Sequence, residues 1–173
     1  PGGVGKAGPA GGGGGAPAHA ASVAASMTAG TVWRIIVMTP TLPTPKRILI
    51  VDDVPDNLSI LFEFLTARGF EVLVADSGEF ALEALTRNNP DLILLDVMMP
   101  GIDGYETCRR IKDNERFRDV PLFFLTALTD TVDKVKGFSL GAVDYITKPI
   151  DPDEVLARVQ AHLDLRSLHL ALE

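Results

Sequence analysis

Apolar runs alternate with helical spacing along the chain from residue 46 onward. Uninterrupted apolar runs are typical of strands buried on both faces of a parallel sheet, whereas apolar residues at every third or fourth position are typical of helices with one buried face. The uninterrupted runs are 48–51, 92–95 and 122–125. Two further mainly apolar segments, 70–74 and 142–146, each contain one acid and are also predicted to be strands. Because a helical segment follows each run, the sequence predicts an α/β fold, a doubly wound five-stranded parallel sheet with helices on both faces.

Local signals mark the ends of the first three helices. Pro55 suits the start of the first helix and Gly69 its end. Asp76 and Glu79 resemble a capping box for the second helix, and the third is expected from about Gly104. Apolar residues at helical spacing accompany these signals. The first helix has Leu58, Leu61, Phe62 and Leu65 on one face, and the second is expected to turn Phe80, Ala81 and Leu85 inward. The third helix carries Tyr105, Cys108 and Ile111, and a fourth holds Val132, Val135 and Leu140.

A fifth helix is predicted from about Asp153, with Pro152 at its entry, to Glu173, and it is longer than one sheet edge requires. Its first half suits packing on the sheet, and its second half carries a separate stripe of leucines at spacings of three and four residues. The two sets are Val155, Leu156, Val159 and Leu163, and then Leu165, Leu168 and Leu172. Residues 164–173 are therefore interpreted as a helical extension or linker, which contacts a partner, leads to a further module or is a frayed tail.

Residues 1–45 differ from the rest in composition. Gly, Ala and Pro dominate this segment, which contains two basic residues, Lys6 and Arg34, and no Asp or Glu. It can bury too little apolar surface to offset its ordering entropy, so it is predicted to be disordered. It lacks the clustered basic start and the apolar core of a secretory signal, and no run approaches the ~20 apolar residues of a membrane span. The change in composition near Met38 is consistent with a native start preceded by other sequence.

Charge and cysteine content limit the classes of function. Residues 46–173 carry 14 basic and 23 acidic residues, a net charge of −9. Such a surface repels phosphate backbones, which argues against direct nucleic-acid binding. The single cysteine, Cys108, excludes an internal disulfide and fits a reducing cytosol, so a cytoplasmic protein is expected. Cys108 itself is interpreted as a small, partly buried helix residue and not as a reactive thiol.

Polar residues follow four of the predicted strands. Asp52 and Asp53 come directly after the first apolar run, and Asp96 comes directly after the third. Thr126 closes the fourth run, and Lys148 follows the fifth. In a parallel sheet all the carboxyl ends of the strands lie on one edge, where open α/β sheets bind their ligands. The sequence therefore predicts one site composed of three acids, a hydroxyl and an ammonium group.

These residue types indicate phosphoryl chemistry. Three neighbouring carboxylates cannot all remain ionised without a cation, and an oxygen ligand set with room for water suits Mg²⁺ better than zinc. With the cation bound, Asp96 can stay anionic and attack a phosphoryl group, which gives an aspartyl phosphate. Lys148 and Mg²⁺ would neutralise the phosphoryl oxygens, and the Thr126 hydroxyl would donate a hydrogen bond.

Residues 46–163 resemble the receiver domain of two-component response regulators. The resemblance rests on the Asp52-Asp53 pair, Asp96, Thr126-Ala127 and Lys148-Pro149, each at the end of its strand. It implies the flavodoxin-like strand order 2-1-3-4-5. It also implies that Asp53, Asp96 and the backbone carbonyl of Met98 are inner Mg²⁺ ligands, and that Asp52 acts largely through water. The Met98 side chain, like that of Met99, is interpreted as core filler.

The resemblance implies a switch and a partner. Asp96 would accept a phosphoryl group from a sensor histidine kinase or a phosphotransfer protein in a phosphorelay. Thr126 would then move toward the phosphoryl group, and Tyr145 would move between exposed and buried rotamers. The face formed by the fourth helix, fifth strand and fifth helix would change, and a homodimer through this face is one expected outcome. The Lys148-Pro149 bond is expected to be cis.

Alternatives remain at the level of residues and of function. Asp52 and Thr126 could each cap a helix, and Lys148 could be a solvated surface lysine. A flavodoxin-type module is disfavoured because acids after the first strand would repel a flavin phosphate, and a dehalogenase-type phosphatase needs a second acid where the chain has Met98. The chain is expected to modify itself, with autodephosphorylation as an option, and not to turn over external substrates. A receiver fragment of a multidomain regulator or hybrid kinase, and a phosphate-independent adaptor, are the alternative functions.

Overall fold

Five parallel strands and five helices alternate along residues 44–127 and 131–173, which are the residues that this computed structural model describes; the side chains of residues 131 and 132 are not among them. The strands are β1 (Arg47–Val51), β2 (Glu71–Ala75), β3 (Leu92–Asp96), β4 (Leu122–Thr126) and β5 (Asp144–Thr147). The helices are α1 (Pro55–Thr66), α2 (Gly78–Arg87), α3 (Gly104–Asp113), α4 (Thr131–Ser139) and α5 (Pro152–Leu172). The segment predicted to be disordered lies outside the described residues except for Thr44 and Pro45.

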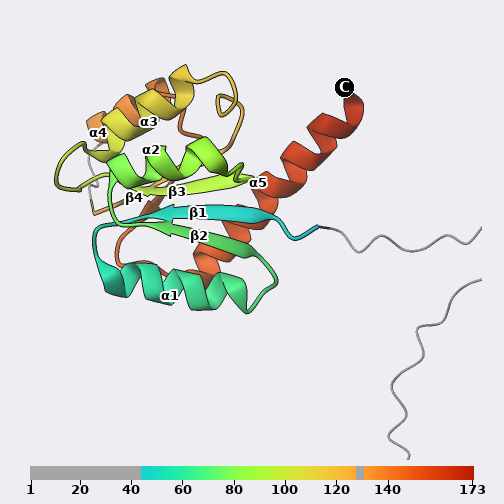
Figure 1. Cartoon of the computed structure of the whole chain (residues 1–173), viewed down its shortest axis with the longest axis horizontal. Helices are drawn as coiled ribbons and strands as arrows, with labels where there is room; N and C mark the ends of the chain where they lie inside the picture. The colour runs from blue at the N-terminus through green and yellow to red at the C-terminus, as the bar shows by residue number, and fades with distance from the viewer. Residues whose placement is uncertain (1–43, 128–130) are drawn as a thin grey trace, which may run out of the picture. The chain divides into compact units, whose positions relative to one another are not determined.

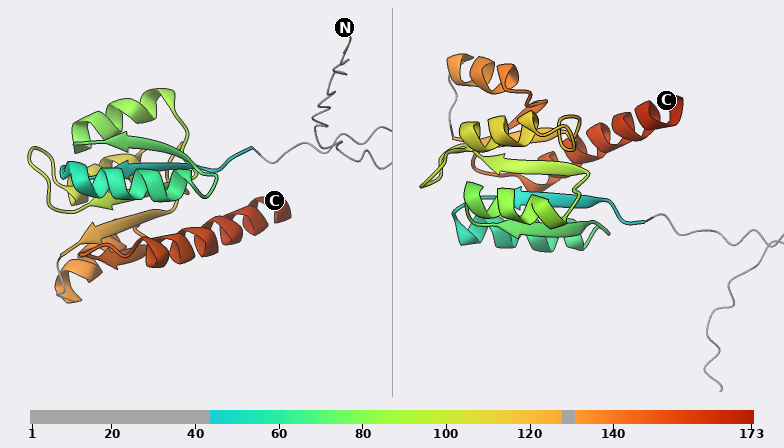
Figure 2. Two further views of the ribbon diagram at one scale, coloured as in Figure 1. Left: turned by 90° about the horizontal axis from the view of Figure 1, so that it is seen from below. Right: turned by 45° about the horizontal axis from the view of Figure 1, so that its top comes forward.

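The strands form one sheet in the order β2-β1-β3-β4-β5, and every pair is parallel, so the predicted fold class and strand order are confirmed. Helices α1 and α5 cover one face, and α2, α3 and α4 cover the other (Figures 1 and 2). This arrangement places two helical layers around one sheet, as a right-handed connection after each strand requires. The carboxyl ends of all five strands consequently share one edge.

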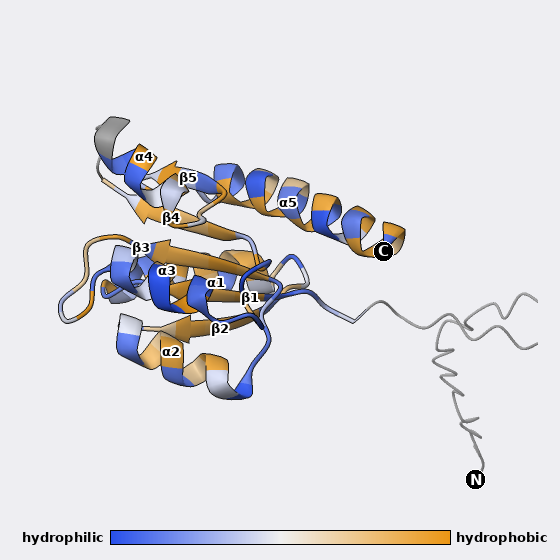
Figure 3. Cartoon of the chain, turned by 90° about the horizontal axis from the view of Figure 1, so that it is seen from above, coloured by the Kyte–Doolittle hydropathy of each residue, from blue (hydrophilic) through white to orange (hydrophobic). Residues whose placement is uncertain are grey.

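Alternate residues of each central strand face opposite helical layers. In β1, Leu49 and Val51 pack with α2 and α3, whereas Ile48 and Ile50 pack with α1 and α5. All four side chains are fully buried, which explains why these strands are apolar throughout and appear orange in Figure 3. The uninterrupted apolar runs in the sequence therefore report burial on both faces.

The first helix begins and ends at the predicted residues. Pro55 occupies the first turn of α1, where a missing N–H leaves no intrahelical bond unmade. Gly69 follows the helix with φ +88°, and the next amide, Phe70 N, donates back to Leu65 O at 3.3 Å. A left-handed residue at this place turns the chain out of the helix and directs it into β2.

The predicted capping box of α2 is wrong. The helix begins at Gly78, and its N-cap is Ser77, whose hydroxyl accepts a hydrogen bond from Phe80 N at 3.2 Å. Glu79 therefore lies one position too early to close a box. Its carboxylate instead accepts a hydrogen bond from Ile102 N at 3.0 Å, in the loop after β3.

Two aromatic residues predicted on buried helix faces are exposed. Phe62 follows Leu61 in α1, and Phe80 precedes Ala81 in α2; Leu61 and Ala81 do face the core. Adjacent helical positions differ in direction by about 100°, so a residue at the edge of the apolar stripe can leave the core completely. Leu61 with Leu65 and Ala81 with Leu85 form the buried faces as predicted.

Smaller differences concern element ends and the cysteine. β2 begins one residue later than predicted, β5 spans 144–147 in place of 142–146, and Leu140 follows α4 without belonging to it. Cys108 is fully buried in α3, and its thiol donates to Leu140 O at 3.7 Å. Burial raises the pKa of Cys108 to about 11, which keeps the thiol protonated and agrees with its interpretation as unreactive.

Within the described part, no helix is long and apolar enough to span a bilayer.

Candidate functional site

Strand register brings the predicted site residues to one edge of the sheet. Val51 pairs with Leu95, so Asp52 after β1 and Asp96 at the end of β3 lie at the same level. Asp96 in turn pairs with Leu125, the residue before Thr126. A backbone bond from Lys148 N to Thr126 O, 2.8 Å long, extends the β4–β5 ladder and fixes where Lys148 leaves the sheet.

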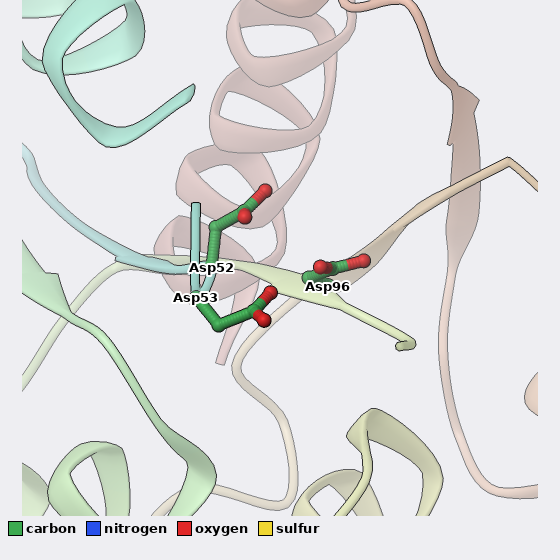
Figure 4. A group of neighbouring side chains, drawn as sticks. All are labelled: Asp52, Asp53 and Asp96. Atoms are coloured by element: carbon green, nitrogen blue, oxygen red, sulfur yellow. The ribbon is translucent and has the colours of Figure 1, made fainter. Parts of the chain in front are cut away.

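Three carboxylates meet at this edge. One oxygen from each of Asp52, Asp53 and Asp96 lies within 4.8 Å of the other two (Figure 4). Asp52 and Asp96 are buried, whereas Asp53 is more accessible to solvent. The cluster therefore has a closed side formed by the sheet and an open side at Asp53.

Lys148 is placed between the two buried acids. Its Nζ lies 3.0 Å from Asp52 Oδ2 and 3.0 Å from Asp96 Oδ2. The Lys148-Pro149 bond is cis, as the resemblance implied. These two ion pairs exclude the interpretation of Lys148 as a freely solvated surface residue.

Asp52 also has a local role at the entry to α1. Its Oδ1 accepts a hydrogen bond from Val54 N at 2.9 Å, and its Oδ2 accepts one from Asn57 Nδ2 at 2.9 Å. The interpretation of Asp52 as a helix cap is wrong, because the N-cap of α1 is Val54, which has no side-chain cap bond; Asp52 instead stabilises the turn before the helix and belongs to the acid cluster. Asn57 was missed in the sequence, since its role depends on how the β1–α1 turn folds back on Asp52.

Burial and neighbouring charges shift the pKa values of Asp96 and Lys148. Burial raises the pKa of Asp96, the hydrogen bond from Lys148 opposes this effect, and the negative charge of Asp52 adds to it, so the pKa lies above its ordinary value. Burial alone would lower the pKa of Lys148, but its hydrogen bonds to Asp52 and Asp96 outweigh that effect and raise it. The ammonium group therefore remains charged at neutral pH.

Two residues assigned to a switch occupy neighbouring strands. Thr126 is buried at the end of β4. Tyr145 in β5 is also buried, and its hydroxyl donates to Asp133 O at 2.9 Å and Lys134 O at 3.1 Å, both in α4. A Cβ at Gly137 would overlap the Tyr145 hydroxyl, so the absence of a side chain there makes room for the ring. Tyr145 thus connects β5 to the backbone of α4.

The loop between β3 and α3 completes the edge. Met98 N donates to Asp96 Oδ1 at 3.3 Å, and Gly104 N donates to Val97 O at 2.9 Å. The Met98 side chain is 65% exposed, so its predicted role as core filler is wrong, whereas Met99 is buried. Val97 is buried after Asp96, and the next residue faces solvent because the strand has ended. The Glu79 bond to Ile102 N, which the sequence did not predict, ties this loop to α2.

Comparison with known proteins identifies the family. The sequence profile of the response regulator receiver domain matches residues 48–160. The chain belongs to this family. The receiver is 46% identical over 115 residues to response regulator PleD of Caulobacter vibrioides (strain NA1000 / CB15N), a match that covers 66% of this chain and 25% of PleD. The matched region spans about half the length of several other curated relatives, in contrast to a quarter of PleD.

Solved receiver structures share the fold. A putative response regulator from Chloroflexus aurantiacus J-10-fl is 41% identical, with a TM-score of 0.66, and the match covers 69% of this chain and 98% of that chain. The receiver domain of sensor histidine kinase PA1611 from Pseudomonas aeruginosa PAO1 is 31% identical, with a TM-score of 0.64 and the same coverage. That crystal structure has a magnesium ion coordinated in its active site cleft.

The acid cluster of this receiver fits a hard divalent cation. Its ligand atoms are carboxylate oxygens, they lie close enough to bind one ion, and the accessible side at Asp53 leaves room for water. Mg²⁺ prefers this combination because it dehydrates reluctantly and usually retains several waters. No histidine or cysteine takes part in the cluster, which disfavours zinc.

Replacement of Asp96 by asparagine is expected to raise the melting temperature of the metal-free receiver at pH 7. Since the pKa of Asp96 is raised in the folded state, the stability contributed by its protonated form is present below the unfolded-state pKa and is lost as pH rises through the folded-state value. Burial and the charge of Asp52 thus disfavour the ionised form of Asp96, and the amide carries no charge to be disfavoured. Thermal denaturation with chelator, at pH 7 and in mildly acidic buffer, should show a difference between the two proteins that shrinks on acidification. A difference that grows would contradict this account.

Proposed function

We propose that this receiver accepts a phosphoryl group on Asp96 from the phosphohistidine of a sensor histidine kinase or of a phosphotransfer protein, with Mg²⁺ as cofactor. The observation that carries the proposal is the position of Lys148 Nζ, 3.0 Å from Asp96 and 3.0 Å from Asp52, beside three clustered acids. An ammonium group beside a nucleophile suits a reaction in which negative charge must be neutralised. Family membership supports the same reaction.

The reaction would exchange one bond to phosphorus for another. A carboxylate oxygen of Asp96 forms a bond to phosphorus, and the bond between phosphorus and the donor imidazole nitrogen breaks. The imidazole keeps the electron pair of the broken bond and takes up a proton from solvent. The product is a mixed anhydride, an aspartyl phosphate. Such a transfer needs little covalent assistance from the protein beyond alignment and charge neutralisation.

Each neighbour of Asp96 has a role in this proposal. Lys148 would form an ion pair with the oxygens of the transferred phosphoryl group, and the Thr126 hydroxyl would donate a hydrogen bond to one of them. Bound Mg²⁺ would supply the remaining positive charge. Alignment would come from the sheet, because Asp96 is buried at a strand end and its Oδ1 accepts a bond from Met98 N.

The hydrogen bonds of the cluster support a division among the metal ligands. Asp52 accepts three bonds, from Val54 N, Asn57 Nδ2 and Lys148 Nζ, whereas Asp96 has two partners, Met98 N and Lys148 Nζ, and the Met98 N contact is long at 3.3 Å. Asp52 is therefore proposed to act on the cation through water. Asp53, Asp96 and the backbone carbonyl of Met98 are proposed as direct ligands, and the accessibility of Asp53 supports its role as the entry point.

The output of phosphorylation is proposed to pass through Thr126 and Tyr145. Movement of Thr126 toward the phosphoryl group would open space beside β5, and Tyr145 would change rotamer. The two bonds from the Tyr145 hydroxyl to α4 carbonyls support this route, since a change at the ring would release or re-form contacts with α4. The surface formed by α4, β5 and α5 would change, and a homodimer through that surface stays a prediction.

A wider context is supported by the lengths of the relatives. The receiver spans 25% of PleD, and the receiver of PA1611 belongs to a sensor histidine kinase. We therefore keep the hypothesis that this chain is the receiver part of a multidomain regulator or hybrid kinase. Its target and the activity of such a protein would lie in segments other than the receiver.

The proposal is tested by incubation with a small acyl phosphate and Mg²⁺, followed by intact-mass analysis. We expect uptake of a single phosphoryl group, sensitive to hydroxylamine as an acyl phosphate is, and prevented by a chelator. Asp53→Asn should greatly slow uptake, since it removes a proposed direct ligand on the open side of the cluster. Rapid labelling in the presence of chelator would refute the Mg²⁺ requirement, and absence of labelling under all conditions would refute the proposed function.

A further inference from the structure

The second half of α5 carries large apolar side chains that the receiver itself does not cover. Helix α5 runs to Leu172, and in all views it continues past the end of the sheet (Figures 1 and 2). Leu165, Leu168 and Leu172 are 62%, 64% and 88% exposed. These residues lie beyond residue 160, where the match to the family profile ends.

The leucine stripe as a whole is turned away from the face of α5 that packs on the sheet, although Leu165 at its edge also borders a groove lined by Pro121 and Val143 of the receiver. Val155, Val159 and Leu163 are buried against the core. Near the end of that contact, Arg166 Nη1 donates to Asp91 O at 2.7 Å, which fixes the rotation of the helix. At about 100° per residue, the buried face and the leucine stripe are separated by roughly half a turn. The receiver therefore cannot bury the stripe by a small rotation of α5.

The spacing of the stripe is that of a coiled-coil seam. Ala161, Leu165, Leu168 and Leu172 follow one another at intervals of four, three and four residues. This alternation gives a repeat of 3.5 residues, which keeps one seam in contact with a second helix. Leu165 and Leu172 take the first core position of the heptad, and Ala161 and Leu168 take the second.

We propose that this seam pairs with the same seam of a second copy of the chain, in a parallel two-stranded coiled coil. The occupant is argued from the charges that flank the seam. In a parallel pair, Asp164 faces His169 of the second copy on both sides of the dimer, and an imidazole N–H can donate to a carboxylate. The His169 side chain is exposed, and its Nε2 lies 3.4 Å from Oε1 of Glu173 on the same helix, so the imidazole is accessible at the surface.

The core positions favour the parallel orientation as well. Parallel alignment places Leu165, Leu168 and Leu172 each against the same residue of the second copy. In the antiparallel alignment Leu172 would face Ala161, which leaves its side chain half covered, and Asp164 would face Ala171. The parallel arrangement thus buries more leucine surface and pairs the polar groups.

The helix is already formed before the seam meets a partner. Its first half is held by the core contacts of Val155, Val159 and Leu163, so association does not require nucleation of a helix. A preorganised element lowers the entropic cost of binding. Residues 161–172 contribute fewer than two heptads to the seam, so the dimer of this chain is expected to be weak and to depend on protein concentration.

The first test uses two leucines of similar exposure on different faces. Leu168 is 64% exposed in the seam, and Leu170 is 59% exposed on the other side of α5. Sedimentation of the full chain over a wide concentration range should show a rising weight-average mass for the wild type and for Leu170→Glu, and none for Leu168→Glu. Circular dichroism should give equal melting temperatures for the two variants at low concentration. A wild type that is monomeric at every concentration, or equal loss of association in both variants, would overturn the proposal.

The second test determines orientation. Leu172→Cys places a thiol where two parallel seams meet, and Ser167→Cys places one outside the seam. Cys108 is buried, so the wild type is the background control. Under mild oxidation, Leu172→Cys should form a disulfide-linked dimer much faster than Ser167→Cys. Equal rates for the two variants would exclude the parallel seam.

Discussion

Replacement of Asp96 by asparagine is expected to abolish phosphoryl uptake entirely. The amide has nearly the shape of the carboxylate and can still accept a hydrogen bond from Lys148, but its oxygen lacks the charge that makes Asp96 a nucleophile. The substitution would therefore preserve the site and remove the reaction. Intact-mass analysis after incubation with a small acyl phosphate and Mg²⁺ should show unmodified protein at all times.

The matched control for this variant is Asp113→Asn. Asp113 is an exposed acid at the end of α3, where it pairs with Arg109 at 2.8 Å, far in the fold from the acid cluster. The control variant should take up phosphoryl groups at the wild-type rate. Labelling of Asp96→Asn at that same rate would show that another residue is the acceptor, and the assignment of Asp96 would be wrong.

Replacement of Gly104 by alanine is expected to destabilise the receiver by about 3 kcal/mol, because added volume in a packed region forces the backbone to shift. A Cβ at this position would overlap the carbonyl oxygen of Asp96 and lie 2.7 Å from Val97 Cα. Both are backbone atoms, so no side-chain rotation relieves the overlap. The displaced segment includes Asp96, so phosphoryl uptake should also be slower.

Urea denaturation measures this effect, with Gly69→Ala as the comparison. Gly69 adopts φ +88° but has open space around its Cβ position, so alanine there should cost only about 1 kcal/mol of backbone strain. The contrast separates steric overlap at the site from conformational strain in a turn. Equal destabilisation by both substitutions would refute the close approach of α3 to the end of β3.

The order of residue types along the chain was enough to predict the fold class and that Asp52, Asp53, Asp96 and Lys148 would meet at one edge of the sheet. Apolar runs such as 48–51 and 92–95 are uninterrupted because both faces of the sheet are buried, and this signal is local. The meeting of Asp52, Asp96 and Lys148 was predicted for a related reason: charged residues at the ends of buried strands need a partner, and parallel strands end on one edge. Neither inference requires knowledge of how the helices pack.

Packing in three dimensions settled which side chains meet and which leave the core. The exposure of Phe62 and Phe80 depends on how α1 and α2 rotate against the sheet, which periodicity fixes only to within a residue. Glu79 resembled a capping residue, yet its partner is Ile102, 23 positions away in the sequence. The bonds of Asn57 to Asp52 and of Tyr145 to α4 also arise only after the loops fold. The physical reason is that hydrogen-bond partners are chosen by distance in space, whereas the sequence pattern records only burial and local backbone preference.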